Sequence, residues 1–223
     1  MYYPTYYVEN FFDNPDEIVN WAKTLTYNKD TNGLWPGKRS QMLHEINVNF
    51  VNAYCYKLFH LIYGRDISQV EWDLNCQFQL INYEDISAEN NQGWIHRDPK
   101  STLTVITYLT NGTNKSGTTI YKPNKLGLGV GGDLKCKPLR NDYYKHNKKS
   151  NNYEEEITKF NNNFTPVAKF YSNYNSTVAF DGGHYHGANW DLKPGEERLT
   201  LISFFNEIKA PYIPIGEMKR QPN

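Results

Sequence analysis

The segment EWDLNCQFQLINY, residues 71–83, alternates between apolar and polar side chains over most of its length. The apolar positions of this alternation are Trp72, Leu74, Cys76, Phe78 and Leu80. Because successive side chains of a β-strand point to opposite faces of its sheet, these five would all lie on one face. The pattern therefore predicts a long strand that packs one face against a hydrophobic core and turns the other toward polar surroundings.

Shorter runs of β-branched, aromatic and aliphatic residues follow farther along the chain. They lie at 102–109, 118–121, 176–181 and 198–206, and segments that contain Gly and Asn separate them. Short strands punctuated in this way are typical of two packed antiparallel sheets. We therefore expect the later part of the chain to form a β-sandwich or jelly roll.

Two helices are expected before these strands. The first lies within 11–25, where Asn14 can cap the helix and Pro15 suits its first position. The second spans about 49–63, with apolar residues at helical spacing, and stops at Gly64. Helices followed by a series of strands indicate the α+β class.

The charge balance gives no sign of a polyanionic partner. The 223 residues include 24 Lys and Arg against 24 Asp and Glu, so the formal net charge is zero. We therefore expect no nucleic-acid partner and no membrane partner. The chain does not begin with a secretory signal pattern, and its three cysteines form no CxxC pair. Both observations favour a reduced, soluble protein of the cytoplasm.

Residues 122–165 differ in composition from the strands on either side of them. They are rich in Gly, Lys, Asn and Glu. A solvated insertion between two strands is the simpler interpretation, and a lid over a site is the alternative. Within this stretch, EEEITKF is compatible with a short helix.

His96 and Asp98 stand one residue apart just before the run at 102–109. Residues i and i+2 of an extended chain project to the same side, so an imidazole and a carboxylate can face one cation there. This pair of ligands suits Fe(II), Mn(II) or Zn(II). A triplet of this kind also arises by chance, so a metal site requires a third ligand from elsewhere in the chain.

Two candidates for the third ligand, His184 and His186, follow the apolar run STVAF. Two histidines and one carboxylate leave three positions of a metal open, as in non-haem iron oxygenases, and a zinc hydrolase can use the same set. Gly182 and Gly183 indicate that the strand has ended before His184. The residues alone leave both histidines open as the third ligand.

Arg198 opens the last apolar strand, RLTLISFF. A buried guanidinium without a partner is costly, so Arg198 either pairs with an Asp or Glu of the chain or binds an anionic ligand. Its planar fork suits a carboxylate. Together with the candidate metal site, this favours a ligand.

Taken in order, these motifs resemble the Fe(II)- and 2-oxoglutarate-dependent dioxygenases, and most closely the prolyl 4-hydroxylase branch. The resemblance rests on the HxD triplet, a distal histidine, an arginine beyond it, ITYLTN after the triplet and SGTTIY farther on. It covers residues 75–207 without the insertion. Ser116 departs from the family's Gly-Gly pair, and the gap from His186 to Arg198 is slightly long.

This resemblance implies a double-stranded β-helix (jelly-roll) core with N-terminal helices packed on it. One oxygenase domain would span residues 1–223. Residues 1–68 would form the helical support and 69–210 the core, interrupted by the polar insertion at about 122–165.

The resemblance also implies a set of site residues for Fe(II), for 2-oxoglutarate as cosubstrate and for O2. The implied metal ligands are His96, Asp98 and His186. The residues implied for the cosubstrate pocket are Arg198, Tyr108, Tyr83 and Thr119.

The activity implied is hydroxylation of an unactivated C–H bond with release of succinate and CO2. Asp98 favours hydroxylation, because related halogenases lack this carboxylate. A prolyl residue in a peptide or protein is the expected substrate, and a small molecule is the alternative. The aromatic residues expected near the mouth of the site are Trp35, Trp94 and Trp190. Two other classes stay open: a jelly-roll binding or structural protein without catalysis, and a metal-dependent hydrolase with the same triad.

Overall fold

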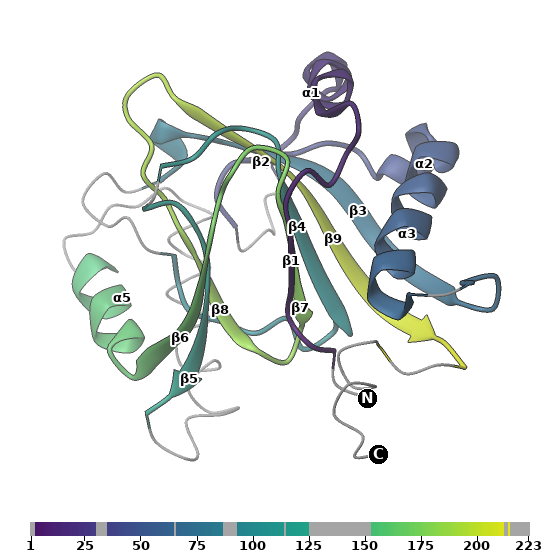
Figure 1. The fold of residues 1–223 in the computed structure, drawn as a ribbon. Helices are drawn as coiled ribbons and strands as arrows, with labels where there is room; N and C mark the ends of the chain where they lie inside the picture. The colour runs from purple at the N-terminus through teal and green to yellow at the C-terminus, as the bar shows by residue number, and fades with distance from the viewer. Residues whose placement is uncertain are drawn as a thin grey trace.

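The computed structural model describes residues 3–29, 35–64, 66–86, 93–113, 115–124, 153–211 and 214, and two sheets form the centre of this part of the chain (Figure 1). The strands of the larger sheet are β1 (Tyr6–Val8), β2 (Lys38–Arg39), β3 (Glu71–Asn82), β4 (Leu103–Tyr108), β7 (Thr177–Asp181) and β9 (Glu197–Lys209). Those of the smaller sheet are β5 (Gly117–Pro123), β6 (Phe164–Tyr171) and β8 (Tyr185–Asn189). The strand orders are β1-β7-β4-β9-β3-β2 and β6-β5-β8. Every strand pair in the described part of the chain is antiparallel.

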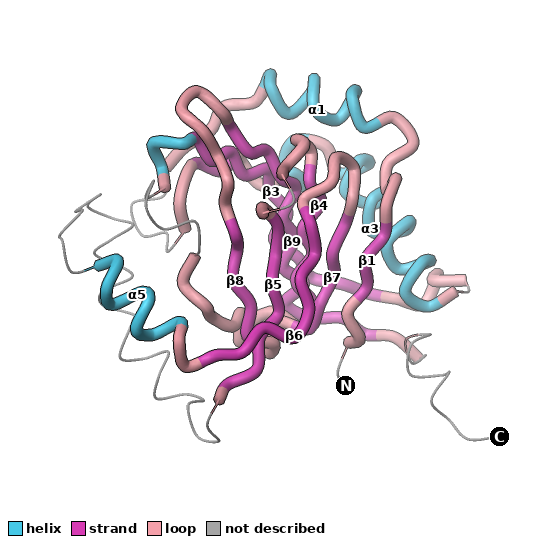
Figure 2. Tube along the Cα trace, turned by 60° about the vertical axis from the view of Figure 1, so that its left-hand side comes forward, coloured by secondary structure: helices cyan, strands magenta, loops and turns pink. Residues whose placement is uncertain are grey.

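The helices lie on the outside of the two sheets, as Figures 1 and 2 show. They are α1 (Pro15–Thr24), α2 (Leu43–Ile46), α3 (Val48–Tyr63) and α5 (Tyr153–Asn161), and a short 3-10 turn, η1 (Tyr83–Asp85), follows β3. Helix α3 packs on the larger sheet, where the ring centroid of Phe59 lies 5.1 Å from that of Phe205 and 5.3 Å from that of Trp72. These contacts make the main hydrophobic core. Among the described residues, no helix is both long and apolar enough to cross a membrane.

Strand β3 has the two faces that its alternation predicts. Leu74, Cys76 and Phe78 are buried in the core beneath the helices. The polar residues between them face the opposite way, into the space between the sheets, where Gln77 and Gln79 line a cavity. The strand is therefore the wall that separates the hydrophobic core from the candidate site.

The two helix starts differ from each other in their capping. Before α3, the Asn47 side chain accepts a hydrogen bond of 3.0 Å from the Phe50 backbone N–H, and the helix ends at Gly64, whose φ is 63°. Asn14 precedes α1 as expected and Pro15 is its first residue, but the Asn14 side chain makes no capping hydrogen bond. Its φ of −124° and ψ of 70° lie outside the extended conformation that N-caps usually adopt. The expected cap at Asn14 is therefore wrong.

Strands β6 and β8 and helix α5 extend the fold beyond the strands expected from the sequence. Strand β6 lies at the edge of its sheet, where Pro166 is tolerated and most side chains are exposed, so its apolar pattern is weak. Helix α5 lies within the stretch expected to be polar, and it buries Ile157 and Phe160. The short helix anticipated at EEEITKF is thus confirmed, and it turns one apolar face toward the rest of the fold. Residues 125–152 of that stretch lie outside the described residues.

Candidate metal centre

Backbone hydrogen bonds fix the HxD segment beside strand β8. His96 and His186 each donate an N–H to the other's carbonyl oxygen, at 2.9 and 2.8 Å. Two residues on, the Asp98 N–H donates to the carbonyl oxygen of Gly182 at 2.8 Å. The segment expected to carry two ligands is therefore paired directly with the segment expected to carry the third.

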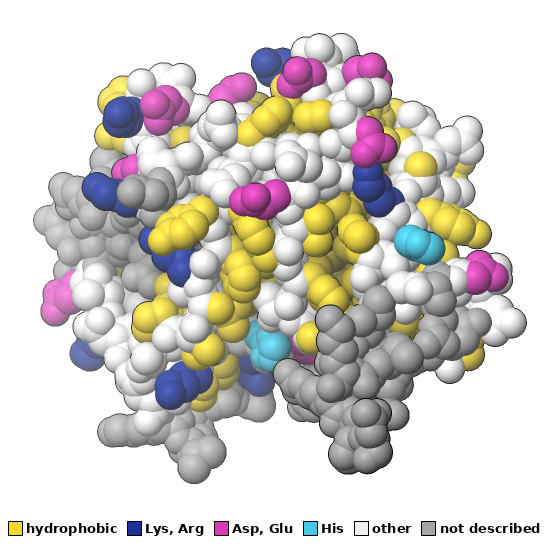
Figure 3. All heavy atoms as spheres, viewed as in Figure 1, with side chains coloured by type: hydrophobic (Ala, Val, Ile, Leu, Met, Phe, Trp, Pro, Cys, Tyr) yellow, Lys and Arg dark blue, Asp and Glu magenta, His cyan; other side chains and the backbone are white. Residues whose placement is uncertain are grey.

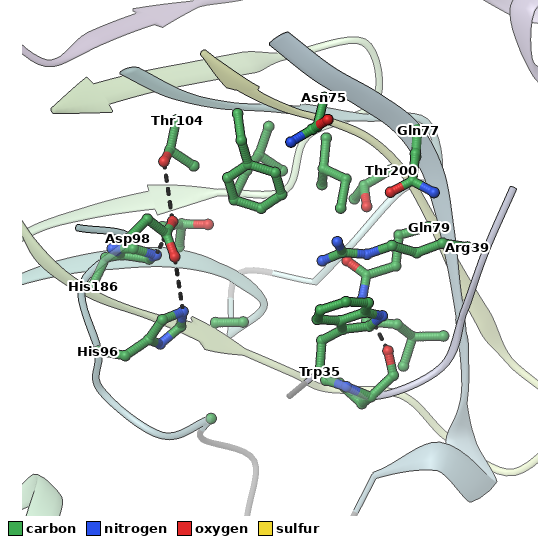
Figure 4. A pocket seen from close by; sticks show the side chains of 18 of the residues that line it. Trp35, Arg39, Asn75, Gln77, Gln79, His96, Asp98, Thr104, His186 and Thr200 are labelled. Atoms are coloured by element: carbon green, nitrogen blue, oxygen red, sulfur yellow. Dashed lines mark hydrogen bonds and ion pairs between the residues drawn. The ribbon is translucent and has the colours of Figure 1, made fainter. Parts of the chain in front are cut away.

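The side chains of His96, Asp98 and His186 converge on one point. One ligand atom from each lies within 4.8 Å of the other two. The His186 Nε2 atom is 3.3 Å from the Asp98 Oδ2 atom, and the His96 Nε2 atom is 3.8 Å from Asp98 Oδ1 (Figure 4). Two imidazoles and one carboxylate at this separation form a compact donor set for one cation.

Groups outside this set hold each of the three side chains in orientation. The Nδ1 atom of His96 lies 2.8 Å from the Trp94 carbonyl oxygen, and that of His186 lies 3.0 Å from the His184 carbonyl oxygen. With Nδ1–H donating to a carbonyl, each ring presents its Nε2 lone pair to the shared point. The Thr104 hydroxyl donates to Asp98 Oδ2 at 3.0 Å and fixes the carboxylate.

Asp98 keeps its negative charge although it is largely buried. Burial by itself would raise the pKa of Asp98, but the neighbouring His186, then His96 and the Thr104 hydroxyl, hold that pKa well below its usual range. The carboxylate is therefore ionised at neutral pH. Two imidazoles and one carboxylate at one point favour a divalent cation.

His184 does not join the other three. It lies in the turn between β7 and β8, and its buried Nδ1 atom has no hydrogen-bond partner in the described part of the chain. Its backbone carbonyl instead supports the ring of His186. The two glycines do end strand β7, as the sequence indicates, but a new strand starts at Tyr185 and carries His186 inward.

Arg198 lies in the same cavity as the three converging side chains. It is 7% exposed, and its guanidinium carbon lies 5.3 Å from the centroid of the Tyr108 ring. Burial lowers the pKa of Arg198, and the neighbouring Tyr108 hydroxyl partly opposes this shift. Among the described residues, no carboxylate forms an ion pair with Arg198, and its Nε–H has no acceptor. The cation is thus buried without an internal anion, which an anionic ligand would supply.

Tyr108 lies beneath Arg198 at the end of strand β4. Its hydroxyl is 2.6 Å from the hydroxyl of Thr118, and the ring is 1% exposed. Thr118 lines the cavity beside Arg198. Two hydroxyl groups therefore lie next to the buried guanidinium.

Two residues expected around the cosubstrate lie elsewhere. Thr119 is not among the residues that line the cavity, and its hydroxyl accepts a hydrogen bond of 2.6 Å from Asn189. Adjacent residues of a strand face opposite ways, so Thr118, and not Thr119, faces the cavity. Tyr83 is also absent from the lining, because strand β3 ends at Asn82 and the chain turns away in η1.

The cavity between the sheets has a volume of about 800 Å³. The three tryptophans expected near the site, Trp35, Trp94 and Trp190, all line it. Figure 4 shows the metal-ligand candidates on one side of the cavity, and Gln77, Gln79 and other polar side chains on the other. This polar wall was not singled out in the sequence, although the alternation of strand β3 places its polar residues on this face.

Comparison with known proteins places the chain in a family. A model of the family of unknown function DUF6445 matches residues 2–205. The chain belongs to this family. The match includes all three converging side chains and Arg198. A comparison with curated proteins found no match.

Several solved structures resemble this DUF6445 protein. A prolyl hydroxylase from Trichoplax adhaerens, in complex with a hypoxia inducible factor oxygen degradation domain peptide fragment, is 10% identical, with a TM-score of 0.51 and coverage of 98% of this chain and 87% of that one. HygX from Streptomyces hygroscopicus, with nickel, 2-oxoglutarate and hygromycin B bound, is 8% identical, with a TM-score of 0.52 and coverage of 90% and 82%.

A third similar structure is an oxidoreductase of the 2OG-Fe(II) oxygenase family from Burkholderia pseudomallei. It is 11% identical, with a TM-score of 0.50 and coverage of 90% of this chain and 83% of that one. At these identities the likenesses show the fold alone. The DUF6445 protein therefore shares a mixed helix and antiparallel-sheet fold with 2-oxoglutarate oxygenases.

Proposed function

We propose that this DUF6445 protein is an Fe(II)- and 2-oxoglutarate-dependent dioxygenase with a double-stranded β-helix core in a single domain. One observation carries the proposal: a two-histidine, one-carboxylate donor set lines the same cavity as a buried arginine that pairs with no carboxylate of the described residues. The donor set fits an iron ion, and the arginine fits the distal carboxylate of a dicarboxylic cosubstrate. The fold shared with solved oxygenases supports the assignment.

In this proposal His96, Asp98 and His186 hold the metal. Their Nδ1 and carboxylate hydrogen bonds keep the donor atoms aimed at one point, so little ordering is needed when the metal binds. Because the set comes from one side, the side toward the cavity stays available for other ligands. Iron with 2-oxoglutarate and O2 would supply the oxidising power that hydroxylates a C–H bond, with release of succinate and CO2.

Arg198 would anchor 2-oxoglutarate through the carboxylate far from the metal. Its planar fork offers two parallel N–H donors, and the low-polarity surroundings strengthen that ion pair. The paired hydroxyls of Tyr108 and Thr118 lie beside the guanidinium and would orient it and the carboxylate. The residues proposed for the cosubstrate are thus Arg198, Tyr108 and Thr118.

We further propose a prolyl residue of a peptide or protein as the group that is hydroxylated. Trp94 and Trp190 are 2% and 6% exposed and present apolar faces to the cavity, against which a pyrrolidine ring can pack. The motif order described above, typical of prolyl 4-hydroxylases, supports the same choice. A peptide library with and without proline, analysed for a single added oxygen by mass spectrometry, tests it. Oxygen added only to small molecules would contradict it.

The experiment that tests the enzyme class uses 2-oxoglutarate itself. Anaerobic addition of Fe(II) and 2-oxoglutarate to the folded protein is expected to give a visible charge-transfer band, and exposure to air is expected to yield succinate. Arg198→Gln is expected to weaken 2-oxoglutarate binding, while Lys209→Gln, which removes an exposed cation of the same strand, leaves it unchanged. A metal-dependent hydrolase would bind the metal but would give neither the charge-transfer band nor succinate. A structural jelly-roll protein would not bind the metal and would give neither the band nor succinate.

A further inference from the structure

We propose that the substrate peptide binds in an extended conformation and that the side-chain amides of Asn75, Gln77 and Gln79 hold its backbone N–H groups. These three side chains are called the amide ladder below. The inference rests on the proposed function for the positions of the metal and of 2-oxoglutarate. It adds how the peptide is held, which neither of those two positions determines.

The amide ladder lies along one wall of the cavity. Asn75, Gln77 and Gln79 are alternate residues of strand β3, so all three side chains are on the face that lines the cavity. Asn75 is exposed, Gln77 is half-buried and Gln79 is 8% exposed. The ladder therefore runs from the mouth of the cavity into its interior. Figure 4 shows Gln77 and Gln79 across the cavity from the three metal-ligand candidates.

The hydrogen bonds of the ladder leave its acceptors available. The Nε2 atom of Gln77 donates to the Ser40 carbonyl oxygen at 2.7 Å, and that of Gln79 donates to the Pro36 carbonyl oxygen at 2.8 Å. Only the nitrogen of an amide can donate to a carbonyl, so these bonds also fix the position of each Oε1 atom. Within the described part of the chain, neither Oε1 atom accepts a hydrogen bond and the Asn75 side chain makes none. A ligand that carries N–H groups would supply the missing donors.

The pairing of the strands places the ladder beside the site proposed for the cosubstrate. In the order β4-β9-β3, strand β9 separates the ladder from Thr104, whose hydroxyl holds Asp98. The guanidinium of Arg198 lies against the ring of Tyr108, which also belongs to β4. The metal and 2-oxoglutarate would thus occupy the part of the cavity over β4 and β9. The ladder stands two strands, or about 10 Å, from β4, so the space over β3 is left for the substrate.

The spacing of the ladder matches the repeat of an extended peptide. Alternate residues of a strand are about 7 Å apart, and the N–H groups on one edge of an extended peptide repeat at the same distance. A peptide alongside β3 can therefore donate two successive N–H groups of one edge to Gln77 and Gln79. A polyproline II helix repeats every three residues and does not match this spacing.

A prolyl residue fits this arrangement at every second position of the peptide. Proline has no N–H, and its ring occupies the side of the backbone on which the N–H would lie. When the residues before and after the proline donate to the ladder, the ring points away from the ladder, toward the metal-ligand candidates across the cavity. The proline then costs no hydrogen bond to the ladder. The residue before a proline also favours an extended conformation.

Recognition by amides does not require a charged substrate. The chain has a formal net charge of zero, and the face of the molecule in Figure 3 shows acidic and basic side chains interspersed. A surface of this kind does not select a ligand by the sign of its charge. Uncharged peptides are therefore the appropriate probes.

The test uses blocked, uncharged heptapeptides with a central proline and varied flanking residues, and the tightest binder is kept as the parent peptide. In four analogues an ester oxygen replaces one backbone N–H, at the residues one and two positions before and after the proline. Affinities are measured anaerobically by calorimetry in the presence of Fe(II) and 2-oxoglutarate. The variants are Asn75→Ala, Gln77→Met and Gln79→Met. Asn206→Ala is the matched control, since it removes an exposed amide of the neighbouring strand β9 that does not line the cavity.

We expect the two ester replacements next to the proline each to lower the affinity about three- to tenfold, and the two farther replacements to leave it unchanged. Gln77→Met and Gln79→Met should each lower the affinity for the parent peptide by a similar factor. Each of them should also become insensitive to one of the two effective replacements, which a purely structural role would not produce. Asn75→Ala should weaken binding about twofold or more, and Asn206→Ala should not.

Three results would overturn the inference: no peptide binds, all four ester replacements have the same effect, or Gln77→Met and Gln79→Met keep the wild-type affinity. The ester series on the wild-type protein decides the matter even where a variant does not fold. Titration with 2-oxoglutarate and the assay for succinate report the proposed function separately. If succinate forms and the ester positions do not alternate, only this inference fails. If the ester positions alternate and neither the charge-transfer band nor succinate appears, only the proposed function fails.

Discussion

Gly182 lies against the backbone that carries Asp98, at a distance that leaves no room for a side chain. A Cβ atom on Gly182 would stand 2.7 Å from the Asp98 carbonyl oxygen and 2.0 Å from that of Ser101. The Asp98 N–H donates to the Gly182 carbonyl oxygen at 2.8 Å. The position of the candidate metal-binding carboxylate therefore depends on the absence of a side chain at a residue that binds nothing itself.

Gly182→Ala is expected to weaken metal binding and to destabilise the fold by about 1–3 kcal/mol, because the two backbone segments must move apart. The control is Gly183→Ala, since Gly183 is exposed and its Cβ would meet only one atom within 4 Å, Asp181 Oδ1 at 2.9 Å. Metal titration and urea unfolding of both variants measure the two effects. Equal metal affinity in the two variants would show that the contact does not position Asp98.

His186→Ala is expected to reduce metal affinity by at least 100-fold or so, because it removes one of three donors. His184→Ala is expected to keep the affinity within a few-fold of wild type. The His184 carbonyl that supports the His186 ring belongs to the backbone and survives the substitution. Anaerobic titration with Fe(II) or Co(II) measures both. Retained metal in His186→Ala would remove this residue from the proposed ligand set.

Periodicity explains which site residues the sequence could identify. His96 and Asp98 are near in sequence, and His186 follows a clear apolar run, so each had a local signal. The choice between Thr118 and Thr119 depends on the exact phase of a strand, and a shift of one residue reverses the face. Tyr83 illustrates the related difficulty of strand ends, because the segment expected to be a strand, 71–83, runs one residue past the point where β3 stops at Asn82.

Thr118→Val is expected to lower 2-oxoglutarate affinity several-fold, because it leaves the buried Tyr108 hydroxyl without its partner at 2.6 Å beside Arg198. Thr119→Val removes a hydrogen bond to Asn189 on the other face of the same strand, so it should affect stability without changing that affinity. Titration with 2-oxoglutarate under anaerobic conditions compares the two. A larger loss in Thr119→Val would restore the assignment made from the motif alone.

Some residues that line the cavity could not be predicted from local patterns in the sequence. Arg39 belongs to a strand of two residues, which is too short to show periodicity, and its place opposite the metal candidates arises from pairing with β3. The Gln77 and Gln79 amides look like ordinary solvent-facing residues until the smaller sheet covers their face of the strand. Such features come from long-range pairing, which local patterns do not encode. The helices α1 and α3, by contrast, follow from local features: Pro15 at the start of α1, the apolar spacing of α3 and its stop at Gly64.

The two described cysteines, Cys55 and Cys76, are expected to resist thiol reagents in the folded protein. Both are fully buried, and burial raises the pKa of each thiol, that of Cys76 to about 12. In a Cys136→Ser background, a chromogenic disulfide reagent should therefore label neither thiol until denaturant is added. Rapid labelling of one equivalent in the native state would contradict this.

The same burial predicts how stability depends on pH. In the unfolded chain a thiol ionises near its ordinary pKa of about 9, while folded Cys76 stays protonated to about 12. Between these two pH values, unfolding therefore releases a proton from Cys76. The contribution of this thiol to the free energy of unfolding is complete below pH 9, and above pH 9 it falls by about 1.4 kcal/mol per pH unit. Urea unfolding of Cys76→Ala from pH 8 to pH 11 should show a shallower decline than the wild-type protein, and parallel declines would refute the assignment.

The two asparagines that precede helices α1 and α3 should differ in their contribution to stability. Asn47→Ala is expected to cost about 1 kcal/mol, because it removes an acceptor for the Phe50 backbone N–H. Asn14→Ala should cost only a few tenths of that, since the Asn14 side chain makes no capping hydrogen bond. Urea unfolding of the two variants gives the comparison. Equal losses would show that Asn14 caps α1 in solution, as its position before Pro15 had led us to expect.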